Sequence, residues 1–109
     1  MAEQLEKERT EYAEKTKPPS FYNVVMLNDD YTPMEFVIHV LKSVFFMDEA
    51  RATTVMLEVH QRGGAVCGTY TLDVARTKAN RVQELAEQQQ YPLHCKVEPA
   101  APNNGMGGE

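Results

Sequence analysis

Apolar residues gather in several stretches of the chain, and their spacing changes from one stretch to the next. Phe21–Leu27 is a short run rich in aromatic and β-branched residues, which is typical of a strand. Ala65–Tyr70 and the alternating segment Leu93–Val97 predict two more strands, the last of them half-exposed. Three longer stretches have apolar residues at helical spacing, and they cover residues 34–45, 48–62 and 72–89.

The predicted element order is therefore β-α-α-β-α-β, without an internal repeat. This order predicts an α+β fold: a two-layer sandwich in which three helices cover one face of a small antiparallel sheet. Four residues are expected to face inward from the third helix, and they are Val74, Ala75, Val82 and Leu85.

Capping signals mark the ends of the predicted helices. Thr32 is expected to cap the first helix, with Pro33 at its first position and Glu35 completing a capping box. The second helix should begin near Asp48 and stop at Gly63-Gly64. Thr71 can cap the third helix.

The two ends of the chain differ from its middle. Residues 1–17 contain five Glu and four Lys or Arg but few large apolar side chains, so they cannot bury enough surface to offset the entropy of ordering. Residues 99–109 are small, polar and rich in Pro and Gly. We therefore expect a flexible N-terminal extension over residues 1–19, a folded core over residues 20–98, and a flexible tail over residues 99–109.

Composition narrows the function classes. The net charge is −5 and the Lys and Arg residues are scattered, which argues against a nucleic-acid partner. Long apolar runs and a signal-peptide core are absent from the sequence, which argues against a membrane partner and against secretion. Cys67 and Cys95 are expected to be buried thiols in a reducing compartment, so the predicted location is cytoplasmic.

The loop Asn28-Asp29-Asp30 concentrates oxygen acceptors between a strand and a helix N-terminus. One interpretation is that these are ordinary turn residues that favour the helix dipole. The other is a cation site, for either a metal ion or an ammonium group with three donors. Metal is the weaker choice, because the further acids that a calcium loop needs are missing.

His60 lies near the end of the second predicted helix, where it can be a capping partner or an acceptor completing a cage with Asn28 and an Asp. Met34 and Met56 fit the core by their spacing, although methionine also lines pockets whose guest varies in shape. A hydrolase or thiol enzyme using His60, Asp30 and Cys67 is the rival interpretation, but Cys67 is expected in mid-strand and buried.

Several segments in the same order closely resemble the ClpS adaptors, which present substrates to the ClpA-type AAA+ unfoldase. The similar segments are Lys17–Val37 (KPPSFYNVVMLNDDYTPMEFV), Arg51–His60 (RATTVMLEVH), Val66–Ala75 (VCGTYTLDVA), Thr77-Lys78, Pro92-Leu93 and Cys95. The resemblance implies the same β-α-α-β-α-β fold and the recognition of N-degrons, which are proteins beginning with Leu, Phe, Tyr or Trp. It also implies a mobile N-terminal arm that reaches towards the unfoldase pore.

The resemblance further implies roles for individual residues. The group expected to receive the free α-amino group of the substrate is Asn28, Asp29, Asp30 and His60, with Thr32 nearby. The apolar pocket is expected from Met34, Val37, Ile38, Met56, Val59 and Leu93, with Met34 as a size gate. Asp73, Thr77 and Lys78 are expected to dock on the N-domain of the unfoldase.

The chain is accordingly predicted to be a monomeric adaptor that makes and breaks no bond and needs no metal or cofactor. Two residues depart from the family pattern. Arg76 stands where an acid is frequent, which leaves the electrostatics of docking open, and Tyr91 stands where His is common.

Overall fold

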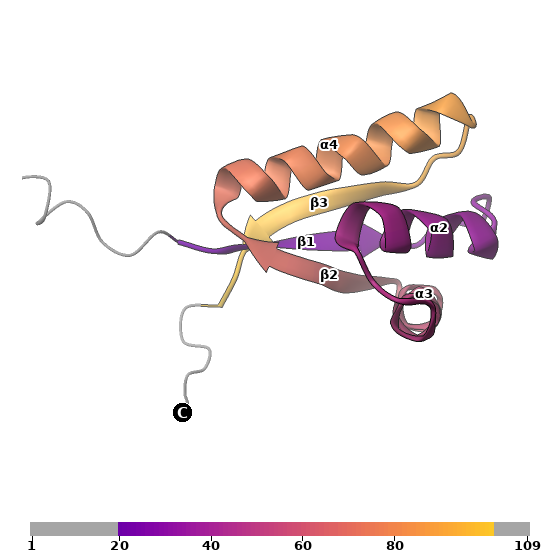
Figure 1. Ribbon diagram of the computed structural model, residues 1–109, viewed down its shortest axis with the longest axis horizontal. Helices are drawn as coiled ribbons and strands as arrows, with labels where there is room; N and C mark the ends of the chain where they lie inside the picture. The colour runs from indigo at the N-terminus through magenta and orange to yellow at the C-terminus, as the bar shows by residue number, and fades with distance from the viewer. Residues whose placement is uncertain (1–19, 102–109) are drawn as a thin grey trace, which may run out of the picture.

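The computed structural model describes residues 20–101, and the predictions for residues 1–19 and 102–109 lie outside this range. Its elements follow the predicted order (Figure 1). They are β1 (Tyr22–Leu27), α2 (Met34–Phe45), α3 (Glu49–Arg62), β2 (Gly64–Tyr70), α4 (Leu72–Gln88) and β3 (His94–Pro99). The α+β prediction is confirmed.

The sheet has β1 at its centre, with β2 and β3 antiparallel on either side. Leu27, the last residue of β1, pairs with Gly64 on one side and with His94 on the other. The chain that leaves β1 therefore emerges between the first residues of β2 and β3. This topology places the loop after residue 27 beside the end of α3.

The core lies on one face of the sheet. Val24 and Met26 of β1 are fully buried and pack in one cluster with residues of all three helices, whereas Val25 points to the opposite face. On the sheet, α4 packs against β1 and β3, and α3 packs against β2 (Figure 1). Helix α2 contacts both of the other helices. The single helical layer agrees with the prediction.

Helix α3 begins and ends where the sequence predicts. The Asp48 carboxylate accepts a hydrogen bond from the backbone N–H of Arg51 at 2.8 Å. At the other end, Gly63 has a φ of 88° and its N–H donates to the Val59 carbonyl at 2.9 Å. This left-handed conformation is one that glycine adopts at low cost, which ends the helix sharply.

The predicted cap of α2 is wrong by one residue. Pro33 occupies the N-cap position, and its carbonyl accepts hydrogen bonds from Phe36 and Val37. The Thr32 hydroxyl instead donates to Asp29 at 2.9 Å, so it is not available to cap the helix. Thr71 does stand at the N-cap position of α4, although its side chain makes no capping hydrogen bond.

Two further expectations need correction. Val74 is 43% exposed, because the buried stripe of α4 runs through Ala75, Val82 and Ala86 and Val74 lies about 100° away around the helix. Pro99, predicted as the first tail residue, belongs to β3 and pairs with Tyr22. The N–H of Ala100 donates to the Phe21 carbonyl at 2.9 Å, so the sheet continues into the predicted tail.

Candidate functional site

A cavity of about 370 Å³ opens between the loop that follows β1 and the end of α3. We call it the loop cavity. It is lined by Asn28, Asp29, Asp30, Tyr31, Thr32, Pro33, Met34, Val37, Met56, Val59 and His60. All five residues expected to receive an α-amino group are in this set, together with four of the six expected to form the apolar pocket.

One backbone hydrogen bond explains how residues far apart in sequence meet here. The N–H of Asn28 donates to the carbonyl of Gly63 at 3.0 Å, and Leu27 pairs with Gly64 in the sheet. The start of the loop is thereby fixed to the end of α3. Asn28 and His60 are both exposed, so their polar groups face solvent at the mouth of the cavity.

Asp29 organises the loop. One of its carboxylate oxygens accepts from the N–H groups of Tyr31 at 2.8 Å and Thr32 at 2.7 Å, and the other accepts from the Thr32 hydroxyl. Burial raises the pKa of this carboxyl, but the two N–H groups and the hydroxyl outweigh burial, so the pKa lies below its ordinary value of 3.8. Asp29 is therefore ionised at neutral pH, and its acceptors are engaged within the loop.

Asp30 differs from its neighbour. It is exposed, and its carboxylate has no hydrogen-bond or ion-pair partner within residues 20–101. Its oxygens remain available to a cation that enters the cavity. The two adjacent acids thus divide into one that holds the loop and one that faces outward.

The apolar wall of the loop cavity comes from two helices. Val37 of α2 and Met56 and Val59 of α3 are buried, whereas Met34 in the first turn of α2 is 49% exposed. Met34 and Val37 are three residues apart and therefore share a face of α2. Met34 consequently lies at the mouth and the other three side chains lie deeper.

Two expected pocket residues do not line this cavity. Ile38 lies about 100° from Val37 around α2 and borders another depression, beside Glu35, His39, Lys42 and Glu49. Leu93 is buried in the core just before β3. Conversely, Tyr31 and Pro33 line the cavity although the sequence pattern does not single them out, and both lie between predicted site residues.

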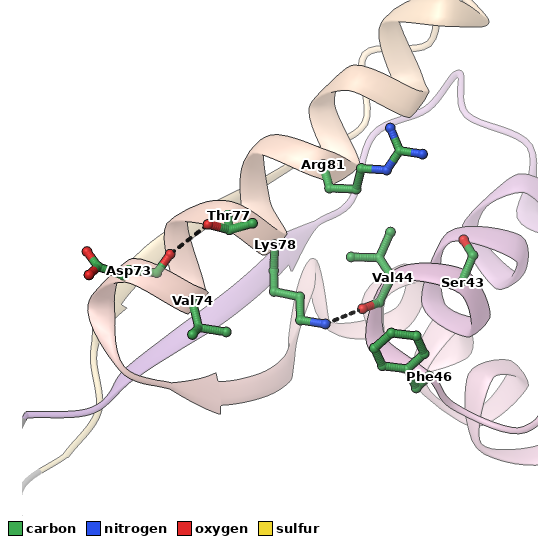
Figure 2. Close-up of a pocket in the computed structure, with 8 residues that line it drawn as sticks. All are labelled: Ser43, Val44, Phe46, Asp73, Val74, Thr77, Lys78 and Arg81. Carbon is green, nitrogen blue, oxygen red and sulfur yellow. Dashed lines mark hydrogen bonds between the residues drawn. The ribbon is translucent and has the colours of Figure 1, made fainter.

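Asp73, Thr77 and Lys78, the predicted docking residues, line a second cavity of about 360 Å³ (Figure 2). We call it the helix cavity, because it lies between α4 and the end of α2. Its other lining residues are Ser43, Val44, Phe46, Val74 and Arg81. The sequence pattern does not predict this second group, of which Phe46 and Val74 are exposed apolar residues.

The structure separates the thiols from the loop cavity. Cys67 lies in β2 and is buried, as predicted, and burial raises the pKa of its thiol to about 12. Burial also raises the pKa of Cys95. Within the described part of the chain, no three His, Cys, Asp or Glu residues are placed to share a metal ion. Among the helices of residues 20–101, none has the length and apolar character needed to cross a bilayer.

The sequence and the fold both match known proteins. Residues 17–96 match the family described as the ATP-dependent Clp protease adaptor protein ClpS. A ClpS adaptor of Rhodospirillum centenum is 56% identical over 84 residues, which cover 77% of this chain and 78% of the relative. A ClpS adaptor of Vibrio atlanticus is 51% identical over 94 residues, which cover 86% of this chain and 85% of the relative.

A solved structure of Agrobacterium tumefaciens ClpS2 bound to L-phenylalaninamide is also similar, with a TM-score of 0.74 and 44% identity. The match covers 75% of this chain and 99% of that protein. Fold, sequence and length of match agree, and the chain belongs to the ClpS family of adaptor proteins of the ATP-dependent Clp protease.

Proposed function

We propose that this adaptor binds the N-terminal residue of substrate proteins that begin with Leu, Phe, Tyr or Trp and delivers them to the ClpA unfoldase. One observation carries the proposal: the loop cavity combines outward-facing acceptors at its mouth with an apolar wall behind them. An N-terminal residue offers the matching pair of features, because its ammonium group and its side chain are bonded to the same α-carbon.

The mouth of the cavity suits the ammonium group. An α-amino group has a pKa of about 7.7–8 and is mostly charged near neutral pH. It has three N–H donors, and the amide oxygen of Asn28, the carboxylate of Asp30 and a ring nitrogen of His60 are three acceptors around the mouth. Asp29 adds negative charge and fixes the loop. An acetylated N-terminus would lose the charge and two of the three N–H donors.

The apolar wall of the loop cavity suits a side chain that has no branch at Cβ. Burying a Leu or Phe side chain contributes about 1.5–3 kcal/mol, and each charge-assisted hydrogen bond contributes about as much. Three such bonds and one side chain sum to about 6–12 kcal/mol before the entropy of association is subtracted. Micromolar binding corresponds to about −8 kcal/mol, which the favourable end of this range reaches. The methionines Met34 and Met56 allow the cavity to accept guests of different shape.

The structural neighbour supports this substrate class. L-phenylalaninamide has a free α-amino group, a phenylalanine side chain and an amide where the next peptide bond of a protein would follow. Binding of this molecule by a protein 44% identical to the present chain agrees with recognition of an N-terminal Phe.

Delivery requires a second contact, and we assign it to the helix cavity, where Asp73, Thr77 and Lys78 meet. No bond needs to be made or broken in either step, so the proposed role is that of an adaptor and not of an enzyme. The raised pKa of the buried Cys67 thiol argues in the same direction, because the thiolate is the nucleophilic form.

Fluorescence anisotropy with peptides that differ only at their N-terminus tests substrate binding. We expect micromolar binding of the Leu-initiated peptide and at least about tenfold weaker binding of its acetylated form, since one lost charge-assisted bond already costs about 1.5 kcal/mol. Val-initiated and Met-initiated peptides measure the selectivity of the wall. Equal binding of free and acetylated peptides would contradict the proposal.

A further inference from the structure

Phe46 is unusual in both its backbone conformation and its exposure to solvent. It is the C-cap residue of α2 with a φ of 58°, a left-handed conformation that Gly or Asn adopts at much lower cost than a bulky residue. The residue is 79% exposed. Strained and exposed positions of this kind often mark functional sites, because packing alone does not explain them.

Val74 is a second exposed apolar residue in the same cavity (Figure 2). It comes from the first turn of α4, whereas Phe46 follows α2. Two elements distant in sequence thus present apolar side chains to one hollow. A single exposed apolar residue is ordinary, but a hollow that joins two of them is typical of an interaction surface.

Lys78 is already engaged within the fold. Its ammonium donates to the Val44 carbonyl at 2.7 Å and lies 4.4 Å from the centre of the Phe46 ring, as Figure 2 shows for the hydrogen bond. It lies 5.7 Å from the centre of the Tyr70 ring. These contacts fix Lys78 between the end of α2 and two aromatic rings, and they hold the Phe46 ring beside α4.

The Tyr70 ring lies over Gly68, and both residues belong to β2. A Cβ atom at Gly68 would overlap the Tyr70 ring and its hydroxyl oxygen, so a larger residue there would displace the ring. The contacts of Lys78, a residue of α4, thus come from Tyr70 of β2 and from the end of α2.

We propose that Phe46 and Val74 form the apolar anchor point of the docking surface, and that Lys78 is a positioning residue that acts through Phe46. This inference rests on the proposed delivery function. The occupant is the docking domain of the Clp unfoldase, and we expect it to insert an apolar side chain between Phe46 and Val74. The anchor is continuous with the predicted docking residues Asp73 and Thr77.

Charge also indicates the chemistry of the partner. The chain has a net charge of −5, yet Lys78 and Arg81 make one side of the helix cavity cationic. Among residues 20–101, the one ion pair of Arg81 joins its guanidinium to the exposed Glu84 carboxylate at 3.3 Å, and such an exposed pair is readily exchanged. We therefore expect a carboxylate on the partner next to its apolar side chain, facing Arg81.

The experiment measures binding of the full-length adaptor to purified Clp unfoldase for the parent, Phe46→Gly, Val74→Ala, Lys78→Met and the Phe46→Gly/Lys78→Met double variant. Phe46→Gly should weaken binding at least tenfold and should not lower the melting temperature, because glycine relieves the left-handed strain. Val74→Ala should weaken binding severalfold. Val66→Ala is the matched control, since Val66 is 44% exposed on the outer face of the sheet and should have no effect.

The double variant tests the positioning role. If Lys78 acts through Phe46, Lys78→Met weakens binding in the parent and has no further effect once Phe46 is glycine. Additive losses would mean that Lys78 contacts the partner independently and would overturn that role. Undiminished binding by Phe46→Gly would overturn the anchor.

Two further measurements distinguish a failure of the anchor from a failure of delivery. Leu-initiated peptide binding should be equal in all variants, and Asp73→Lys should weaken unfoldase binding whether or not Phe46 is an anchor. If only Asp73→Lys loses unfoldase binding, the proposed delivery function stands and the anchor is refuted. If the parent does not bind the unfoldase, both the delivery function and the anchor are refuted. Sedimentation showing a dimer that Phe46→Gly disrupts would identify a second copy as the occupant and overturn the assignment to the unfoldase.

Discussion

The loop cavity and the helix cavity are nearly equal in size, at about 370 and 360 Å³, but they differ in charge. Asp29 and Asp30 lie at the first, whereas two cations, Lys78 and Arg81, and one acid, Asp73, lie at the second. Helix α2 contributes to both, through Met34 at its start and Val44 near its end.

The dipole of α2 accounts for part of this contrast. The N-terminus of a helix carries partial positive charge and favours acids, whereas the C-terminus favours cations. Asp29 and Asp30 precede the N-terminus of α2, and the Lys78 ammonium binds the Val44 carbonyl at its C-terminal end. One helix thus has the acids of the loop cavity at its N-terminal end and the Lys78 ammonium of the helix cavity at its C-terminal end.

The largest effect that we expect is confined to the loop cavity. Asn28→Ala, or Asp30→Ala combined with His60→Ala, should cost at least about 2 kcal/mol of peptide affinity, a loss of about 30-fold, because the ammonium is left desolvated and without its acceptors. Anisotropy with a Leu-initiated peptide measures it.

Unfoldase binding by the same variants is the control, and it should not change. Parent-like peptide affinity in folded variants would refute the site assignment. A parallel loss of unfoldase binding would show that the two cavities are coupled through α2.

Substitutions of Asp29 and Asp30 should differ in their effects on the free energy of unfolding. Asp29→Asn should lower the free energy of unfolding by about 1 kcal/mol, because the ionised carboxylate accepts three hydrogen bonds from the loop. Asp30→Asn should leave stability unchanged and weaken peptide binding. Urea unfolding of both variants measures the difference.

The Asp29 effect should depend on pH. The pKa of Asp29 is lowered in the folded chain, so its contribution is fully present above the ordinary value of 3.8 and is lost as the pH falls through the lower folded value. The stability gap between parent and Asp29→Asn should be constant near neutral pH and close under acid conditions. A gap that does not narrow at all as the pH falls below 3.8 would contradict this account.

The contrast between the cavities also explains what the sequence could predict. The buried face of α3 and its Asp48 and Gly63 ends followed from spacing and capping chemistry, which are local properties. The polar members of the loop cavity stood out because Asn28, Asp29 and Asp30 are adjacent and His60 ends a helix.

The helix cavity depends on contacts that sequence spacing does not encode. Val74 fits the apolar periodicity of α4, and only the docking of α4 on β1 and β3 turns it away from the core. Phe46 directly follows Phe45, and nothing local indicates that the first ring is buried and the second exposed. Thr32 resembled a helix cap, but Asp29 competes for its hydroxyl.

A smaller effect should appear at Met34, which we propose distinguishes substrates at the mouth of the loop cavity. Val and Ile carry bulk at Cβ, next to the half-exposed Met34 side chain, whereas Leu and Phe branch farther in. Met34→Ala should therefore admit Val-initiated and Ile-initiated peptides to within about tenfold of Leu, while Leu binding falls only modestly. If the variant rejects Val and Ile as strongly as the parent does, Val37 or Met56 sets the selectivity.

The smallest effect should come from Cys67, which belongs to neither cavity. Its thiol is buried in β2 and burial raises its pKa to about 12, so it acts as a small apolar side chain at neutral pH. Cys67→Ala should lower the free energy of unfolding by about 1 kcal/mol through the small void it leaves, and peptide and unfoldase binding should stay within about twofold of the parent. The same peptides and unfoldase serve as probes, with thermal unfolding as the check on folding. A well-folded Cys67→Ala variant that lost either activity would require a role for the thiol that the geometry of both cavities does not provide.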